Sequence, residues 1–188
     1  RAGKQPFSAL SVEGPMARNV ADCALMFECE AGAHPFDPLS RPVASGSYSA
    51  AAAHPQKPKR VAYSVDLGVT PVVHGETRTV VEAAAKKIAG EGVIVEEVHP
   101  DLSDAVKNFM VLRGAIYIAR MAPLLEKYRH LWKPEVIGNT EFGLSLQLSE
   151  VVAAEIAQGE IVRRMARFFE TYDLLIAPSV VLYGSTHA

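Results

Sequence analysis

The stretch KRVAYSVDLGVTPVVHGETRTVVEAAAKKIAGEGVIVEEV, residues 59–98, decides the fold class. Residues 59–64 and 93–98 alternate in polarity or carry β-branched side chains, and each predicts a short strand. Between them an amphipathic helix is predicted, ending at the glycines around Gly92. Its core-facing pattern comes from Thr77, Val80, Val81, Ala84 and Ile88. A strand, a helix and a strand form a β-α-β unit, whose right-handed crossover makes the two strands parallel neighbours.

The helix of this unit should turn Val81 or Ala84 toward the sheet. The loop that leads into it, DLGVTPVVHG at residues 66–75, lacks the close glycine spacing that brings backbone amides to a phosphate. We therefore favour a structural role for the unit over the alternative, nucleotide binding.

Upstream of this unit, a helix is predicted from Asn19 to Ala31, where apolar residues recur at helical spacing. Asn19 and Asp22 form a capping pair at its start, and Gly32 supplies the stop. Residues 33–58 are rich in Pro, Ser, Ala and Gly, and they predict an irregular linker or surface excursion.

Downstream, residues 101–128 carry a broad apolar face that predicts helix, which Pro123 should bend or end. Ser149, followed by Glu150, predicts the start of another helix that continues to about residue 171. These helices alternate with strands, so the sequence predicts an α/β fold. We expect part of a mixed central sheet flanked by helices, with the β-α-β unit in the middle of the chain.

The run LLIA at residues 174–177 is apolar on both faces, which is typical of a strand covered on both sides in a central sheet. If this chain does not supply the covering elements, an exposed apolar patch should surround Leu174, Ile176 and Val180. Stability would then depend on the rest of a longer protein.

Composition excludes several classes of function. The formal charge of -2 lacks the basic excess that nucleic-acid binding requires, and no apolar run reaches the roughly 20 residues of a bilayer span. We therefore expect neither a nucleic acid nor a membrane as partner. Cys23 and Cys29 match no metal-ligand or redox spacing, and they are expected to be core thiols in a reducing, cytoplasmic compartment.

The titratable residues form no recognised catalytic or metal-binding motif. Asp101, Asp104, Glu96 and Glu97 are interpreted as solvated polar faces. Exposed loop positions are expected for the six histidines, His34, His54, His74, His99, His130 and His187. The sequence implies no metal and no cofactor.

Two segments resemble a known family. SVEGPMARNVADCAL, residues 11–25, is similar to the segment GPMAR-(T/S)-VAD-x-AL of amidase signature enzymes. FFETYDLLIAPS, residues 168–179, resembles their late segment YD-(V/L)-LL-x-PT. Asp66-Leu67-Gly68 and Glu141-Phe142-Gly143 fall between these in the family's order, so the resemblance covers nearly the whole chain. It implies an amidase that hydrolyses carbon–nitrogen bonds of small-molecule amides.

The first of these motifs has a structural interpretation. Gly14-Pro15 gives a tight turn into the helix, and Arg18 can pair with Asp22 one turn along it. The alternative, contact between Arg18 and a substrate carboxylate, stays open. We favour the structural pair.

The resemblance also implies where catalysis takes place. In this family a serine is activated through a second serine, held by a cis peptide, and a lysine, beside a glycine-serine-rich loop that precedes the GPMAR-like segment. Lys4, Ser8 and Ser11 lie in no such loop. We therefore expect no catalytic residue in this chain, both ends of the family domain to be absent from it, and no amide hydrolysis by the isolated chain. Its partners would be the rest of the amidase chain and an amide substrate, with oligomerisation left open.

The resemblance further implies that residues 109–117 can line the acyl side of a substrate pocket. Phe109, Ile116 and Tyr117 would form an apolar wall, with Gly114 permitting close approach. The alternative is an ordinary apolar core stripe. Rival interpretations of the whole chain are a non-catalytic α/β binding or scaffold module, and a two-chain enzyme whose other polypeptide brings the catalytic residues.

We expect residues 1–188 to form one partial amidase domain with four segments. These are the GPMAR-like turn and helix at 1–32, the linker at 33–58, a variable β-α-β and helical region at 59–148, and a late helix and core strand at 149–188.

Overall fold

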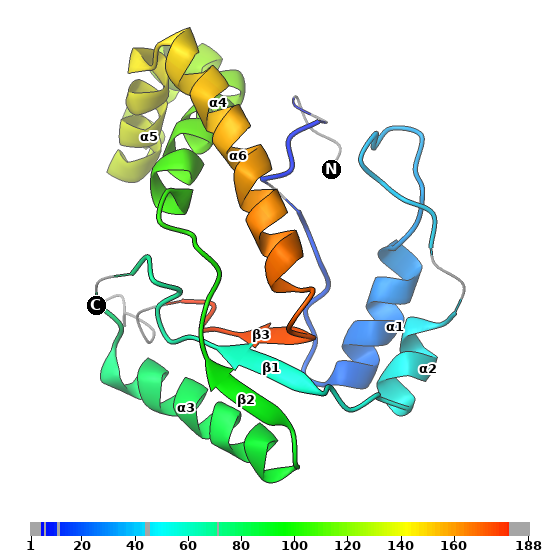
Figure 1. Ribbon diagram of the computed structural model, residues 1–188. Coiled ribbons are helices and arrows are strands. Elements are labelled where there is room, and N and C mark those ends of the chain that lie inside the picture. Colours follow the sequence, from blue (N-terminus) through cyan, green and yellow to red (C-terminus); the bar gives the residue numbers. More distant parts are fainter. Residues whose placement is uncertain (1–4, 6, 11, 44–45, 71, 181–188) are drawn as a thin grey trace. The chain divides into compact units, whose positions relative to one another are not determined.

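The computed structural model describes residues 5, 7–10, 12–43, 46–70 and 72–180 (Figure 1). The chain divides into two compact units, the first formed by residues 1–56 and 112–146 and the second by residues 57–111 and 147–188. In chain order the elements are α1 (Val20–Glu30), α2 (Tyr48–Ala53), β1 (Arg60–Tyr63), α3 (Gly75–Gly90), β2 (Ile94–Glu97), α4 (Ala105–Tyr128), the 3-10 turn η1 (Arg129–Leu131), α5 (Pro134–Ser145), α6 (Leu148–Phe168) and β3 (Leu174–Ile176).

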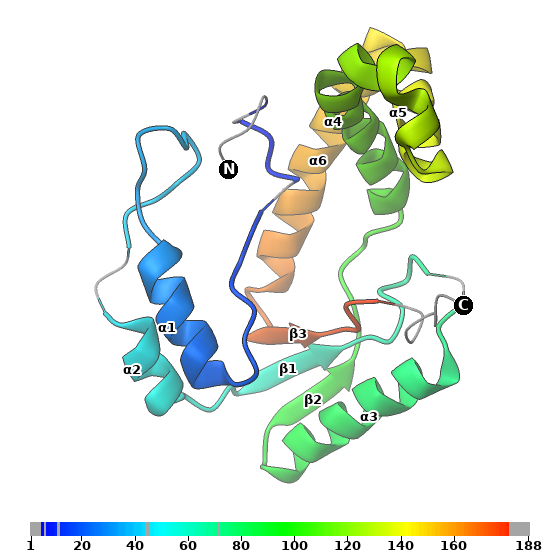
Figure 2. The same cartoon turned by 180° about the vertical axis from the view of Figure 1, so that it is seen from behind.

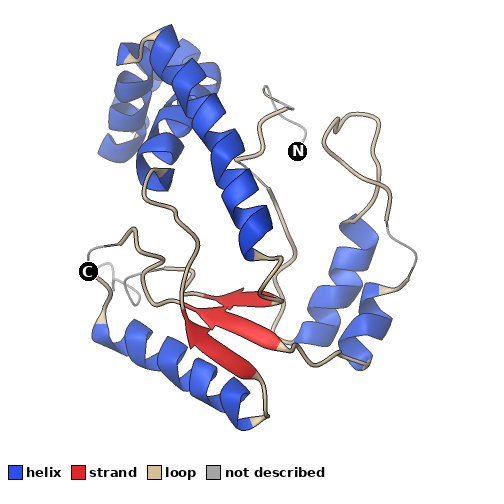
Figure 3. Cartoon of the chain, in the orientation of Figure 1, coloured by secondary structure: helices blue, strands red, loops and turns tan. Residues whose placement is uncertain are grey.

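The second unit contains a three-stranded sheet in the order β2-β1-β3 (Figure 3). β1 pairs in parallel with both neighbours, Val61 lying opposite Val95 of β2 and Leu174 of β3. The predicted α/β class and parallel β-α-β unit are confirmed, and every pairing between the described strands is parallel. Val61 and Ala62 of the central strand are fully buried.

Helix α3 lies beside β2 in both views of the chain (Figures 1 and 2). Val81 is buried, as predicted. Ala85 is buried as well, whereas Ala84 is only partly buried. Ala85 follows Val81 by four positions and therefore lies on the same face of the helix. Gly92 lies in the turn between α3 and β2 and has a φ of 76°, which glycine adopts without steric cost.

Strand β3 is fastened to β1 by the residue that precedes it. The Asp173 carboxylate accepts hydrogen bonds from the backbone N–H groups of Lys59 at 2.7 Å and Arg60 at 2.9 Å. The Asp173 N–H donates in turn to the Arg60 carbonyl at 2.9 Å. The guanidinium of Arg60 lies 5.4 Å from the centre of the Tyr172 ring and is hydrogen bonded to Glu96 of β2. The Tyr-Asp pair before the strand therefore positions all three strands.

The edge position of β3 leaves part of it uncovered. Leu174 is 49% exposed and Val180 is 64% exposed, whereas Ile176 is half-buried. This agrees with the apolar patch expected around these residues.

Acidification should weaken the side-chain bonds that join the three strands. Hydrogen bonds from Arg60 and Lys59 N–H lower the pKa of Asp173, and the Arg60 side chain lowers the pKa of Glu96. A carboxyl whose pKa is lowered by folding stabilises the folded state above its unfolded pKa of about 4, and that contribution is lost as the pH falls through its folded pKa. Urea unfolding at pH 7, 5, 4 and 3 should show the midpoint falling mainly below pH 4.

The matched control is Asp173→Asn, which removes one of these titrations. Its unfolding midpoint should be lower than wild type at pH 7, and the difference should shrink toward pH 3. A difference that is independent of pH would show that the Asp173 carboxylate does not stabilise the sheet.

The first unit begins with the helix predicted at the amino terminus. The Asn19 side chain caps α1 by accepting a hydrogen bond from the Asp22 N–H at 2.8 Å, as predicted. The Asp22 carboxylate also accepts from the Asn19 side chain at 2.7 Å. The expected pairing of Asp22 with Arg18 is wrong, because this local bond takes the carboxylate instead. Cys29 is exposed rather than a core thiol, since no residue of α1 is buried, and Cys23 is half-buried.

The predicted linker contains helix α2, which could not be predicted from the high content of Pro, Ser and Gly in residues 33–58. Ser47 caps α2 by accepting from the Ala50 N–H at 3.2 Å, and an alanine run with high helix propensity follows. Helix α2 packs beside α1, where the rings of Phe27 and Tyr48 meet edge to face at 4.7 Å. The Ser49 hydroxyl donates to Glu28 at 2.5 Å. The prediction of an irregular segment throughout residues 33–58 is therefore wrong at its centre.

Helix α4 does not end at Pro123 but continues to Tyr128. The residues after the proline, including Leu124, Leu125 and Lys127, are good helix formers, so the helix tolerates the loss of one backbone hydrogen bond. Helix α5 was not predicted. It crosses α4 so closely that a Cβ built on Gly143 would lie 2.5 Å from the Gly114 carbonyl oxygen.

Helix α6 starts one residue before the predicted Ser149. Its N-cap is Gln147, whose backbone N–H donates to the Glu150 carboxylate at 2.8 Å. Glu150 thus acts at the predicted helix start, but in a capping box with Gln147 rather than after a serine cap. The helix ends at Phe168, close to the predicted end.

Candidate functional site

Two loops leave the carboxyl ends of the parallel strands β1 and β2, an edge at which α/β proteins often bind ligands. In the first, the backbone N–H groups of residues 67–70 are all engaged by acceptors within the loop. Leu67 N–H donates to the Ser64 hydroxyl and Gly68 N–H to the Asp66 carboxylate, while Val69 and Thr70 donate to the Asp66 carbonyl. These amides are not free for a phosphate. This geometry supports the structural role that the sequence favoured over nucleotide binding.

The conformation of the first loop restricts its residues. Leu67 and Gly68 have φ values of 54° and 67°, and a Cβ on Gly68 would lie 2.2 Å from Cε1 of His99 in the second loop. The Gly68 N–H lowers the pKa of the Asp66 carboxyl. The loop is therefore a closed turn with the His99 ring against it.

The second loop, residues 98–104, leads into α4, and Arg164 of α6 forms ion pairs with it. Its guanidinium lies 3.3 Å from the Asp101 carboxylate and also pairs with Asp104. The pKa of Asp101 is lowered by hydrogen bonds from the Ser103 backbone N–H and hydroxyl, and then by the charge of Arg164. Asp101 and Asp104 retain partial exposure, as predicted, but their shared partner on α6 was not foreseen.

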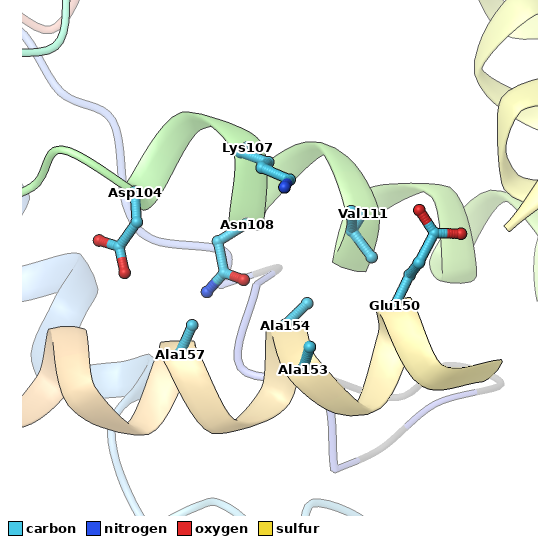
Figure 4. Close-up of a pocket in the computed structure, with 8 residues that line it drawn as sticks. All are labelled: Asp104, Lys107, Asn108, Val111, Glu150, Ala153, Ala154 and Ala157. Carbon is cyan, nitrogen blue, oxygen red and sulfur yellow. The ribbon is translucent and has the colours of Figure 1, made fainter. Parts of the chain in front are cut away.

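Between the start of α4 and the start of α6 lies a pocket of about 290 Å³ (Figure 4). Asn108 extends from α4 toward α6, with its amide group close to Ala154 and Ala157. Asn108 is only 7% exposed. The residues that line the pocket are Asp104, Lys107, Asn108, Val111, Glu150, Ala153, Ala154 and Ala157.

Sequence reasoning missed Asn108, although a signal was present. Val111 and Leu112, three and four residues later, are buried and lie on the same helical face. A polar residue in register with buried apolar residues is a stronger indication of a site than a polar residue on a solvated face.

The predicted substrate-binding residues all lie on α4, but not in one unit. Phe109 belongs to the second unit and is 43% exposed. Ile116 and Tyr117 belong to the first unit and are half-buried, and the Arg113 guanidinium donates to the Tyr117 hydroxyl at 3.2 Å. Gly114 does permit a close approach, but the partner is α5.

The described residues contain no serine or cysteine side chain hydrogen bonded to a lysine or histidine side chain. No cluster of His, Cys, Asp and Glu suited to a metal ion occurs among them. The histidines at positions 34, 54, 74, 99 and 130 are exposed or partly exposed, in line with the prediction, and His187 lies outside the described residues. In the described part of the chain, none of the helices combines the length and the apolar character needed to cross a membrane.

Comparison with known proteins decides the family. A family model described as Amidase matches residues 2–187. The chain belongs to the amidase signature family. The fold of the chain is also similar to the crystal structure of a bacterial aryl acylamidase of the amidase signature family, with 21% sequence identity and a TM-score of 0.80. The match covers 93% of the chain and 38% of the aryl acylamidase. Among curated proteins, no match is found.

The family assignment confirms the resemblance found in the two motifs. In this chain, residues 12–19 of the GPMAR-like segment lead into α1 and residues 20–25 form its first turns. The YD-LL segment forms the junction after α6 and strand β3. Asn19 and Asp173 therefore have structural roles in these motifs, since Asn19 caps α1 and Asp173 binds the backbone at the start of β1.

Proposed function

We propose that this chain is part of an amidase that hydrolyses carbon–nitrogen bonds of small-molecule amides. The observation that carries the proposal is the amidase family match over residues 2–187. The nucleophilic serine, the second serine with its cis peptide, and the lysine would lie in the protein outside residues 1–188. The chain itself would contribute helices and a sheet that support the substrate site.

Many polar groups of the described residues are bonded to one another, and this supports a structural rather than a catalytic role for the chain. Asp101 and Asp104 pair with Arg164, Glu96 pairs with Arg60, and the amides of residues 67–70 are bonded within their own loop. Groups held in this way stabilise a scaffold and are poorly placed to transfer protons to a substrate.

The test compares the intact protein with residues 1–188 alone. The intact protein should be labelled stoichiometrically by a fluorophosphonate and should hydrolyse a simple aryl amide. The 188-residue chain should do neither, because acyl transfer depends on the activated nucleophile and the oxyanion-binding amides. An intact protein without labelling and turnover would favour a non-catalytic α/β binding or scaffold module. Labelling of the short chain would overturn the proposed location of the nucleophile.

Within this function, Phe109, Ile116 and Tyr117 are each proposed to contact the apolar part of the substrate. Phe109→Ala in the intact enzyme should raise KM for an aryl amide about 10-fold, since the loss of one aromatic contact costs about 1–3 kcal/mol in a binding pocket. The matched control is Phe36→Ala, at a ring that is 77% exposed and should not alter KM. Equal KM values for both variants would show that Phe109 does not contact the substrate.

A further inference from the structure

One face of helix α6 carries apolar residues that are exposed to solvent. Its positions follow one another at alternating intervals of four and three residues, which is the spacing of a coiled-coil seam. Leu148, Val152 and Val162 of this face are 79%, 47% and 63% exposed. We call this face the α6 seam, and its positions are Leu148, Val152, Glu155, Gly159, Val162 and Ala166. Their spacing suits the face to pairing with a second helix.

Two charged side chains accompany the α6 seam, Glu155 within it and Arg163 beside it. Glu155 has no ion-pair partner among the residues that the structure describes. Arg163 pairs with Glu160 on the same helix, and these two side chains are 58% and 53% exposed. Because a surface pair of this kind contributes little to stability, Arg163 can exchange its partner at small cost.

The two charges are placed symmetrically, four residues before and four residues after Gly159. In an antiparallel pair of α6 helices with a two-fold axis at Gly159, each position meets the one equally far on the other side of the axis. The pairs that this symmetry brings together are Glu155 with Arg163, Ile156 with Val162, and Val152 with Ala166. A parallel pair in register would instead place the two Glu155 carboxylates against each other. Charge therefore favours the antiparallel arrangement.

The residue at the centre of the seam permits a close approach. A Cβ built on Gly159 would meet the Arg163 guanidinium at 3.6 and 3.9 Å, which are ordinary contacts, so packing against the described residues does not require a glycine here. Glycine in the interior of a helix is destabilising, since it orders more backbone than alanine does. The approach of another helix would account for it, as the crossing of α4 and α5 accounts for Gly143.

We propose that α6 pairs with α6 of a second copy of the protein, in an antiparallel two-fold dimer centred on Gly159. Two Glu155–Arg163 ion pairs flank the axis, and the exposed apolar side chains of the seam are buried between the helices. A helix of 21 residues is about 32 Å long, so this interface is smaller than the roughly 1,200 Å² of standard complexes. The dissociation constant should therefore lie in the micromolar range. The proposal does not depend on the proposed hydrolytic function.

The test is sedimentation equilibrium of the intact protein from about 1 to 200 µM, which brackets a micromolar dissociation constant. The wild type should show a monomer–dimer equilibrium. Glu155→Arg places like charges together at two symmetric positions, and it should raise the dissociation constant about tenfold, as should Arg163→Glu. The double variant with both substitutions restores opposite charges, so its dissociation constant should return to within about threefold of the wild-type value.

The matched control is Glu126→Arg, the same charge reversal at an exposed residue of α4. It should leave the dissociation constant unchanged. Melting temperatures of all variants should stay close to that of the wild type, because each replaced side chain is exposed.

An intact protein that stays monomeric throughout this range would overturn the proposal and favour another part of the same amidase as the element that covers the α6 seam. Unchanged association in the two single variants, or no recovery in the double variant, would overturn it as well. All of these outcomes are read from molecular mass alone, so they are independent of amide hydrolysis.

Discussion

Replacing Gly143 with alanine should destabilise the first unit by about 3 kcal/mol, the upper part of the usual range for overpacking. The new Cβ would lie 2.5 Å from the Gly114 carbonyl oxygen and 3.0 Å from its carbonyl carbon. Both are backbone atoms, so the clash can be relieved only if α4 and α5 move apart. Urea unfolding of the purified variant, followed by circular dichroism, measures the loss.

The control for this prediction is on the same helix. Gly138 also lies in α5, but a Cβ there meets nothing within 4 Å. Gly138→Ala should therefore stabilise the protein by about 0.5–1 kcal/mol through helix propensity. Both substitutions replace a glycine with alanine in the same helix. If one lowers the free energy of unfolding and the other raises it, the close crossing of α4 and α5 at Gly143 is the cause. Similar effects at both positions would show that α4 and α5 do not pack at these glycines.

Truncation of the central strand should have a comparable effect. Val61 of β1 is fully buried, and Val61→Ala should cost about 2–3 kcal/mol because it removes buried apolar surface and leaves a cavity. Val80→Ala on α3, where the side chain is 60% exposed, should change stability by no more than about 0.5 kcal/mol. Denaturant unfolding of both variants at pH 7 tests the difference. Equal costs would mean that β1 is not the centre of the core.

The parts of the fold that follow from local sequence periodicity were predicted correctly. The β-α-β unit could be predicted because its pattern and its punctuating glycines lie within residues 59–98. The pairing of β3 with β1 was not predicted, because hydrogen bonds between Asp173 and Lys59 join positions far apart in the sequence. Helix α2 was missed because the prolines around it dominate the composition, whereas its cap and its alanine run are short.

The packing partners of the helices could not be predicted for a different reason. A sequence specifies residue types on a helix but not the element opposite them. Gly114 was therefore assigned to close approach near a ligand, although α5 occupies that position. Asn108 was overlooked because its burial depends on α6, which begins about 40 residues later.

The fastening of β3 by Asp173 has a consequence for how the protein is made. Asp173 and Lys59 are separated by 114 residues. At a synthesis rate of about 5–20 residues per second, the ribosome needs roughly 6–23 s to add that length. Once β2 has been made, the nascent β1 can pair with it, but the other edge of β1 still has no β3. A bare strand edge is a template for association with other chains. The helices made after β2, which are α4 to α6, therefore emerge while one edge of the sheet still lacks its native neighbour.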